Sequence, residues 1–168
     1  FTIEDNEVVT TPQVLNDIGD RGKIEDEGAL LTGPTAITMN NNNQKVENEG
    51  TIVTSDADAF GVYSLGSGNK IDNSGSITTT SDDAFGINVE GDNTTVVNSG
   101  EITTLSIGAR GISSNGTNFN GENKGTITTG GADGIGVSLG SASYFKNSGS
   151  IVTGGSPGAI GILFQGPD

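Results

Sequence analysis

The chain has 168 residues and a formal net charge of −14, and so acidic a surface disfavours nucleic acid as a partner because phosphate groups are repelled. It contains no cysteine, which excludes disulfide bonds, thiol catalysis and thiolate metal sites. No apolar run is long enough to cross a bilayer, so we expect no direct membrane insertion by this chain.

The first 23 residues lack the regular spacing that governs the rest of the chain. We expect this segment, residues 1–23, to form an irregular N-terminal coil or cap. The second predicted unit, residues 24–168, is one continuous repeat domain, and we expect the whole chain to be a fragment of a longer protein.

A triplet Asn-x-Gly recurs five times from residue 48 onward, at steps of 25, 25, 25 and 24 residues. An isoleucine stands two residues after each glycine. Self-similarity at a fixed period of this length predicts a solenoid with one coil per repeat, roughly six coils in all, and not a single central core. The repeated residues are Asn48, Asn73, Asn98, Asn123 and Asn147, then Gly50, Gly75, Gly100, Gly125 and Gly149, then Ile52, Ile77, Ile102, Ile127 and Ile151.

Apolar and polar residues alternate with period two around each triplet, which is the pattern of half-buried strands. No window has the spacing of an amphipathic helix, so the predicted class is all-β. Two or three short strands separated by turns fit into about 25 residues, which predicts a three-sided coil. Successive coils would stack about 4.8 Å apart and bring the isoleucines into one internal ladder.

The stacked coils give the triplet a structural role. We expect the asparagine to point inward and to bond the asparagine of the next coil. We expect the glycine to adopt a positive φ at the corner, where a Cβ would clash. A threonine column six residues after the Asn position is expected to use its hydroxyls in the next bend: Thr32, Thr54, Thr79, Thr104, Thr129 and Thr153.

Three aspartates, Asp58, Asp83 and Asp133, share one column of the repeat, which Gly108 interrupts. Stacked carboxylates can bind Ca²⁺ or act as an acid–base pair. Aspartate is also a common turn residue, and the favoured interpretation is a solvated acidic edge with no metal, no cofactor and no catalytic residue.

Arg110 departs from its column, in which the other coils carry phenylalanine or isoleucine. We expect it to turn outward or to pair with Asp83 or Asp133, although it could also serve as the base of a polysaccharide lyase. Exposed aromatic residues in a groove would favour a polysaccharide-binding module, and the sequence offers three candidates for that role: Tyr63, Phe119 and Tyr144.

The strand after each triplet carries outward hydroxyls, as flat ice-binding β-solenoid faces do. Only Thr126-Ile127-Thr128 fits the Thr-x-Thr pattern fully, and Glu101 breaks the rank. At the end of the chain, Leu163-Phe164-Gln165-Gly166-Pro167 resembles a rhinovirus-type protease site used in recombinant expression, so we expect the last few residues to be non-native.

The combination of Asn-Ser-Gly-x-Ile-x-Thr with Ala-x-Gly-Ile about a dozen residues later resembles the passenger repeats of Gram-negative autotransporters. The resemblance covers residues 24–162 and implies a right-handed parallel β-helix of the pectin-lyase-like architecture. It implies a non-enzymatic passenger of an exported outer-membrane-associated protein, displayed at the bacterial cell surface as a rigid stalk with a role in adhesion or virulence.

The expected partner of such a passenger is a receptor or glycan of a host or bacterial surface. Self-association through the open β edge of an end coil is a further expectation. Two alternatives to the stalk remain open, a carbohydrate-active or polysaccharide-binding β-helix module and an ice-binding β-solenoid.

Overall fold

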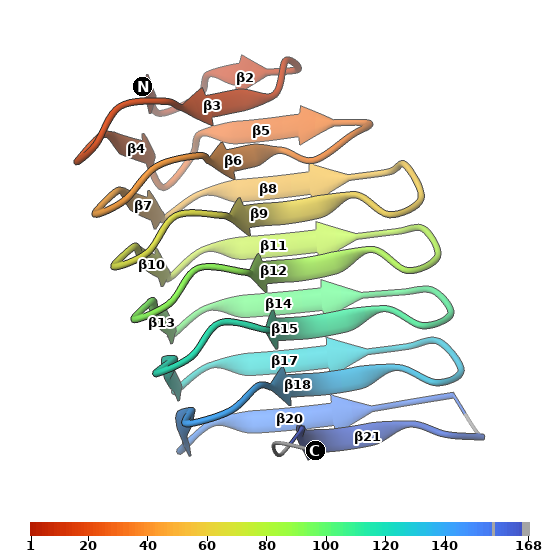
Figure 1. Cartoon of the computed structure of the whole chain (residues 1–168). Helices are drawn as coiled ribbons and strands as arrows, with labels where there is room; N and C mark the ends of the chain where they lie inside the picture. Colours follow the sequence, from red (N-terminus) through yellow and green to blue (C-terminus); the bar gives the residue numbers. More distant parts are fainter. Residues whose placement is uncertain (156, 166–168) are drawn as a thin grey trace.

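The computed structural model describes residues 1–155 and 157–165, and within them the chain forms three parallel sheets of seven strands each. Figure 1 shows these strands stacked coil upon coil along one axis. The sheets are named A, B and C in the order in which each coil visits them. No helix in the described ranges has the length and apolarity that a membrane span requires.

Sheet A consists of β1 (Thr2–Ile3), β4 (Arg21–Ile24), β7 (Lys45–Asn48), β10 (Lys70–Asn73), β13 (Thr95–Asn98), β16 (Asn120–Asn123) and β19 (Tyr144–Asn147). Sheet B consists of β2 (Val8–Val9), β5 (Ala29–Thr32), β8 (Thr51–Thr54), β11 (Ser76–Thr79), β14 (Glu101–Thr104), β17 (Thr126–Thr129) and β20 (Ser150–Thr153). Sheet C consists of β3 (Gln13–Leu15), β6 (Ile37–Met39), β9 (Phe60–Ser64), β12 (Phe85–Val89), β15 (Arg110–Ser114), β18 (Ile135–Leu139) and β21 (Ile160–Phe164).

Each strand pairs with the strand at the same position in the next coil, in the register that the repeat predicts. Ile77 of β11, for example, lies between Ile52 of β8 and Ile102 of β14. The predicted all-β, three-sided parallel β-helix is therefore confirmed, with six coils from β4, which begins at Arg21, onward.

The N-terminal segment forms a coil of the same kind, with strands of two or three residues. β1 pairs with β4, β2 with β5 and β3 with β6. The ring of Phe1 occupies the space that a side chain at Gly22 would need. The segment before Arg21 thus adds one coil to the stack, and residues 21–23 belong to β4 of the next coil.

The core is the inside of the tube. In the middle coils the strands of sheet B alternate half-buried and buried residues, and Ile52, Ile77, Ile102 and Ile127 are fully buried. Burial of each such side chain contributes about 1.5–3 kcal/mol. Because the ladder is continuous, every coil stabilises its two neighbours.

At Gly121 the interior space that a side chain would occupy is filled by the ring of a residue at another position of the coil. Gly121 stands where neighbouring coils carry Val96 and Phe145, and the ring of Phe119 packs against it. Phe119 is only 1% exposed and belongs to the core. The expectation that Phe119 is a surface aromatic is therefore wrong, because the missing side chain at Gly121 leaves interior room for its ring.

Gly166 and Pro167 of the protease-like sequence lie outside the described residues, which end at Gln165.

Candidate functional site

The corner between sheets A and B carries a ladder of asparagine amides. Each Nδ2 donates to the Oδ1 of the asparagine in the next coil, at 2.7 Å for the first three steps and 2.8 Å for the last. The same amides also donate to backbone carbonyls, as Asn98 does to Thr126. Asn48, Asn73, Asn98 and Asn123 are 1% exposed or less. The inner members of the ladder are therefore occupied by one another and have little capacity left for a ligand.

The glycine of each triplet does not adopt a positive φ, so that expectation is wrong. Positive φ values occur at other glycines, and Gly50, Gly75, Gly100, Gly125 and Gly149 are not among them. A Cβ on Gly100 would instead overlap the carbonyl oxygen of Gly75 in the preceding coil, and the other four glycines face the same obstacle. Close stacking of two backbones, and not an unusual backbone conformation, requires glycine here.

The corner between sheets B and C holds the acidic column, and there the backbone is left-handed. Asp58, Asp83 and Asp133 have φ of 57°, 52° and 57°, and Gly108 and Gly158 continue the column at 69° and 92°. Aspartate and glycine are two of the residue types that tolerate this region best. The alternation of Asp and Gly therefore has a conformational cause.

The acidic column is not assembled into a metal site. In the ranges 1–155 and 157–165, no group of three or more Asp, Glu, His or Cys side chains lies close enough to hold a metal ion. The neighbouring Asp82 uses its Oδ1 to accept hydrogen bonds from the Ser106 hydroxyl and from the Ile107 amide. The structure thus spreads these carboxylates along an exposed corner.

The threonine column is buried except at Thr153, which is half-buried, and its hydroxyls bond as expected in only some coils. Thr32 Oγ1 donates to the Pro34 carbonyl at 2.7 Å and Thr79 Oγ1 to the Ala84 carbonyl at 3.3 Å. The hydroxyls of Thr54, Thr104 and Thr129 have no hydrogen-bond partner among the described residues.

The outer face of sheet C carries an aromatic strip, because its strands place two consecutive residues inward. In β9, Gly61 and Val62 are both buried, so that Phe60 and Tyr63 both face outward. The ring of Phe60 lies 4.9 Å from that of Tyr63 and 5.4 Å from that of Phe85, between centroids. Desolvation, with a smaller effect of Glu90, raises the pKa of Tyr63.

Arg110 extends this strip: of the two expected arrangements, the structure shows the outward side chain and not the ion pair with Asp83 or Asp133. Its guanidinium lies over the Phe85 ring, 5.1 Å from the centroid, which is cation–π geometry. Its Nη1 donates to the hydroxyls of Ser113 and Ser138, at 3.3 and 3.4 Å. The side chain therefore lies along the outer face of the sheet, whereas both aspartates stand on the corner.

The outer face of sheet B shows the ranked hydroxyls in register. Thr126 and Thr128 of β17 lie beside Glu101 and Thr103 of β14. The Glu101 carboxylate accepts a hydrogen bond from Thr103 Oγ1 at 3.0 Å. A charged side chain thus stands in the middle of the rank, and nothing here favours ice binding over an ordinary soluble face.

Sheet A gathers the cations of this acidic chain. Of the seven Lys and Arg residues, Arg21, Lys23, Lys45, Lys70 and Lys146 belong to its strands, and Lys124 follows β16. Lys23 pairs with Glu25 and Glu49, and Lys70 with Asp72. Each of these pairs is partly exposed, so its contribution to stability is small.

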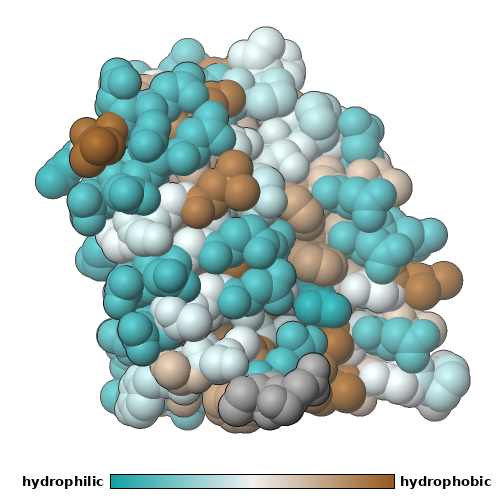
Figure 2. Space-filling model, viewed as in Figure 1, coloured by the Kyte–Doolittle hydropathy of each residue, from teal (hydrophilic) through white to brown (hydrophobic). Residues whose placement is uncertain are grey.

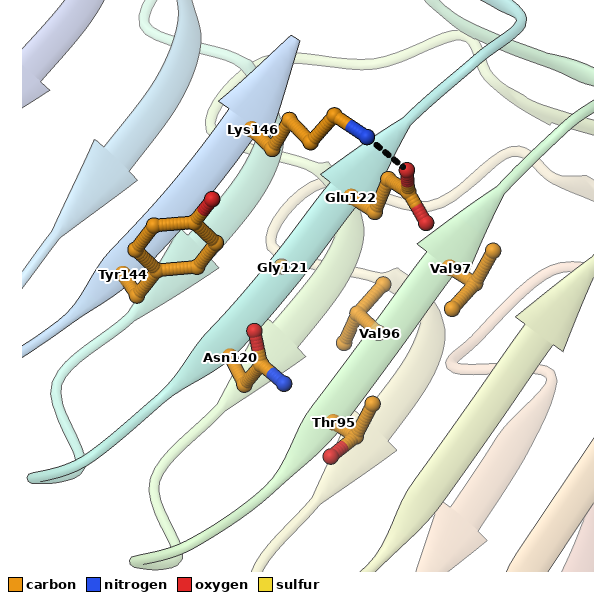
Figure 3. Close-up of a pocket in the computed structure, with 8 residues that line it drawn as sticks. All are labelled: Thr95, Val96, Val97, Asn120, Gly121, Glu122, Tyr144 and Lys146. Carbon is orange, nitrogen blue, oxygen red and sulfur yellow. Dashed lines mark hydrogen bonds and ion pairs between the residues drawn. The ribbon is translucent and has the colours of Figure 1, made fainter.

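The same face is hollowed between β13, β16 and β19 (Figure 3). The hollow has a volume of about 240 Å³ and is lined by Thr95, Val96, Val97, Asn120, Gly121, Glu122, Tyr144 and Lys146. Lys146 Nζ lies 3.1 Å from Glu122 Oε1, and Lys124 Nζ lies 2.9 Å from the other carboxylate oxygen. Hydrogen bonds from Lys124 and Lys146 lower the pKa of Glu122, and the bond to Glu122 raises that of Lys146.

Of the sequence candidates only Tyr144 lies at this hollow, and it is 61% exposed. Its partners Asn120, Glu122 and Lys146 were not singled out from the sequence. The available signal was the change in the outward columns of sheet A, from paired charges in the early coils to mixed residues in the later ones.

A comparison with family models matches residues 6–163 to the BigA third pectate lyase-like domain. Comparisons with curated proteins and with solved structures gave no match. The family match covers nearly the whole chain and agrees with the three-sided parallel stack described above. The chain therefore belongs to the family of the BigA third pectate lyase-like domain, a domain of an autotransporter-like bacterial surface protein.

Proposed function

We propose that this domain is a non-enzymatic display segment of a bacterial surface passenger, with a role in adhesion or host contact. The observation that carries the proposal is that each coil combines a constant interior with outward residues that vary. The repeated asparagines, glycines and isoleucines are internal or stacked on backbone, whereas the outward columns change from coil to coil. A scaffold of constant interior and variable exterior suits the presentation of surfaces.

The rod would act by holding its outer faces in fixed positions. Amide bonds link the coils along the A–B corner from Asn48 to Asn147, and backbone bonds link them in all three sheets. On the face viewed in Figure 2, hydrophilic residues cover most of the surface and hydrophobic residues form separate patches. Apolar patches rimmed by polar side chains are typical of surfaces that contact a partner.

Binding of the purified, folded domain to host cells and to bacterial surfaces tests the proposal. We expect saturable binding that heat unfolding of the domain abolishes. In parallel, the domain is incubated with acidic polysaccharides in the presence of calcium, and unsaturated products are measured. Turnover that is lost on Asp83→Ala would show that the proposal is wrong.

A second candidate is polysaccharide binding along the aromatic strip of sheet C, defined by Phe60, Tyr63, Phe85 and Arg110. The specific observation in its favour is the guanidinium held over the Phe85 ring by two serine hydroxyls. An arginine fixed in this way is preorganised for a carboxylate. Arg110→Gln should weaken retention on an immobilised acidic polysaccharide, whereas Lys70→Gln on sheet A should not.

A further inference from the structure

The outer face of sheet A changes in character along the rod. In β7 and β10 the outward positions are Lys45, Glu47, Lys70 and Asp72, which form one ion pair within each strand and a third, Lys45–Asp72, between the strands. From β13 onward the same positions hold short, uncharged or aromatic side chains together with the Glu122–Lys146 pair. The hollow begins where the continuous ladder of ion pairs ends.

The shape of the hollow limits what it can hold. In Figure 3 the Tyr144 ring and the Lys146–Glu122 pair stand at the β19 and β16 side, with Thr95 and Val97 on β13 opposite. Pockets for drug-sized ligands have about 300–1,000 Å³. A hollow of about 240 Å³ is therefore suited to a single ring.

The lining offers an apolar platform and hydrogen-bonding groups of both kinds. Tyr144 is 61% exposed, so its ring can stack against a ligand. Lys146 donates, the Glu122 carboxylate accepts, and the exposed Asn120 amide does both. Hydroxyl groups both donate and accept, so a polyhydroxylated ring uses such a mixed lining better than a simple anion or cation does.

The charge of the site favours a neutral ligand. The Glu122 carboxylate lies 3.1 Å from Lys146 Nζ and 2.9 Å from Lys124 Nζ, and the chain as a whole carries −14. The net charge of the protein opposes the approach of anions, and the two ammonium groups around one carboxylate repel a cation locally.

We propose that this hollow binds one neutral pyranose unit of a surface glycan, stacked on Tyr144 and hydrogen-bonded by Asn120 and the Lys146–Glu122 pair. The inference rests on the proposed display function and names the ligand class for one of the displayed faces. It assigns the sugar to the hollow on sheet A and gives the aromatic strip of sheet C no part in binding it.

The test is an NMR titration of the isotopically labelled domain with methyl glycosides of glucose, galactose and mannose, and with glucuronic and galacturonic acids. A ligand this small is expected to bind with a dissociation constant on the order of 1 mM. We expect at least one neutral glycoside to shift the amide signals of residues 120–122 and 144–146 in a saturable way, and the uronic acids to bind more weakly.

Matched variants locate the site. Tyr144→Ala should weaken binding about tenfold, whereas Tyr144→Phe should retain most of it because the ring is kept. Tyr63→Ala removes the other tyrosine, on sheet C, and should leave the affinity unchanged. Thermal unfolding of each variant confirms that the exposed substitution leaves the fold intact.

The assignment is overturned if Tyr144→Ala binds like the unaltered chain, if the shifted amides lie on sheet C, or if the uronic acids bind as tightly as the neutral sugars. Cell binding separates this inference from the proposed function. A domain that binds cells but none of the neutral sugars refutes the hollow and leaves the display function standing. A domain that binds a neutral sugar through Tyr144 but binds no cells supports the hollow and refutes the display function.

Discussion

The corner between sheets A and B and the corner between sheets B and C both contain recurring glycines, for different physical reasons. At the A–B corner the carbonyl oxygen of the preceding coil occupies the place of a Cβ, and all five triplets keep glycine. At the B–C corner the backbone is left-handed, and Asp83 and Gly108 occur at equivalent positions with φ of 52° and 69°. Where a backbone atom occupies the place of a Cβ, only glycine fits. Where the backbone is left-handed, glycine, aspartate and asparagine are all tolerated.

The third corner, between sheets C and A, shows both physical reasons. Its left-handed column consists of Gly19, Asn43, Gly68, Asn93, Asn118 and Ala142. Asparagine and glycine again share the column, as aspartate and glycine do at the B–C corner. The same corner also carries Gly66, Gly91 and Gly116, where a Cβ would overlap a carbonyl oxygen of the preceding coil, so close backbone stacking limits substitution at the A–B and C–A corners alike.

The largest effect is expected for Gly100→Ala at the A–B corner. Its Cβ would overlap the backbone of Gly75, which cannot move without separating two coils. We expect a loss of about 3 kcal/mol or more in the free energy of unfolding, measured by denaturant titration. Gly108→Asn is the matched control, because its Cβ would meet only the movable Asp83 carboxylate and asparagine tolerates a left-handed φ. If the two variants unfold with the same free energy, the steric cause at Gly100 and the conformational cause at Gly108 are not different.

Asn98→Ala, in the middle of the amide ladder, should have the next largest effect. It removes the donor to Asn123 and leaves the amide of Asn73 without its acceptor, both in a buried place. The expected cost is about 2–3 kcal/mol. The control is Asn147→Ala at the exposed end of the ladder, which should cost clearly less. If thermal unfolding ranks the two variants in the opposite order, the ladder is not a main source of stability.

Substitutions of Asp83 test whether the acidic column has a conformational role or binds a metal ion. We expect Asp83→Gly to change the free energy of unfolding by less than about 0.5 kcal/mol, and Asp83→Val to cost about 1–2 kcal/mol at this positive φ. The melting temperature of the unaltered chain should be the same in calcium and in a chelator. A calcium-dependent rise in melting temperature that Asp83→Gly abolishes would restore the metal-site interpretation.

The smallest effect concerns acid sensitivity at the C–A corner. Hydrogen bonds from the Thr117 amide and hydroxyl lower the pKa of Asp92. The ionised Asp92 carboxylate should therefore stabilise the folded state fully above its ordinary pKa of 3.8. This stabilisation should be lost as the pH falls through the lower pKa that Asp92 has in the folded state. Asp92→Asn should melt slightly below the unaltered chain at neutral pH and approach it in acid. A difference that is independent of pH would contradict this account.

The fold could be predicted from the sequence because its interior repeats. The period, the inward isoleucines and the asparagine ladder all follow from the spacing of identical residues, and the register of the sheets agrees with that spacing. The candidate site could not be predicted in the same way. Tyr144, Asn120 and Lys146 are different residues from two coils, and their proximity depends on which side chains in neighbouring coils leave space.

The errors of prediction have one physical origin. Gly100 and Arg110 are each constrained by the residue at the same position of the preceding coil, and Phe119 by a gap at another position, and the spacing of the repeat shows none of these contacts. The carbonyl of Gly75 constrains Gly100, the Phe85 ring holds Arg110, and the gap at Gly121 draws Phe119 inside.

The sequence by itself determined the architecture, because a stack of coils turns one-dimensional spacing directly into three-dimensional neighbours. It determined that the triplet asparagines and isoleucines face inward, as they do in the middle coils. Only the tertiary structure decided why each corner needs its residues, since backbone clashes and left-handed φ values both appear as glycine in a sequence. Only the tertiary structure located the hollow beside Tyr144, because an empty space arises from the lengths of several side chains and not from any one residue.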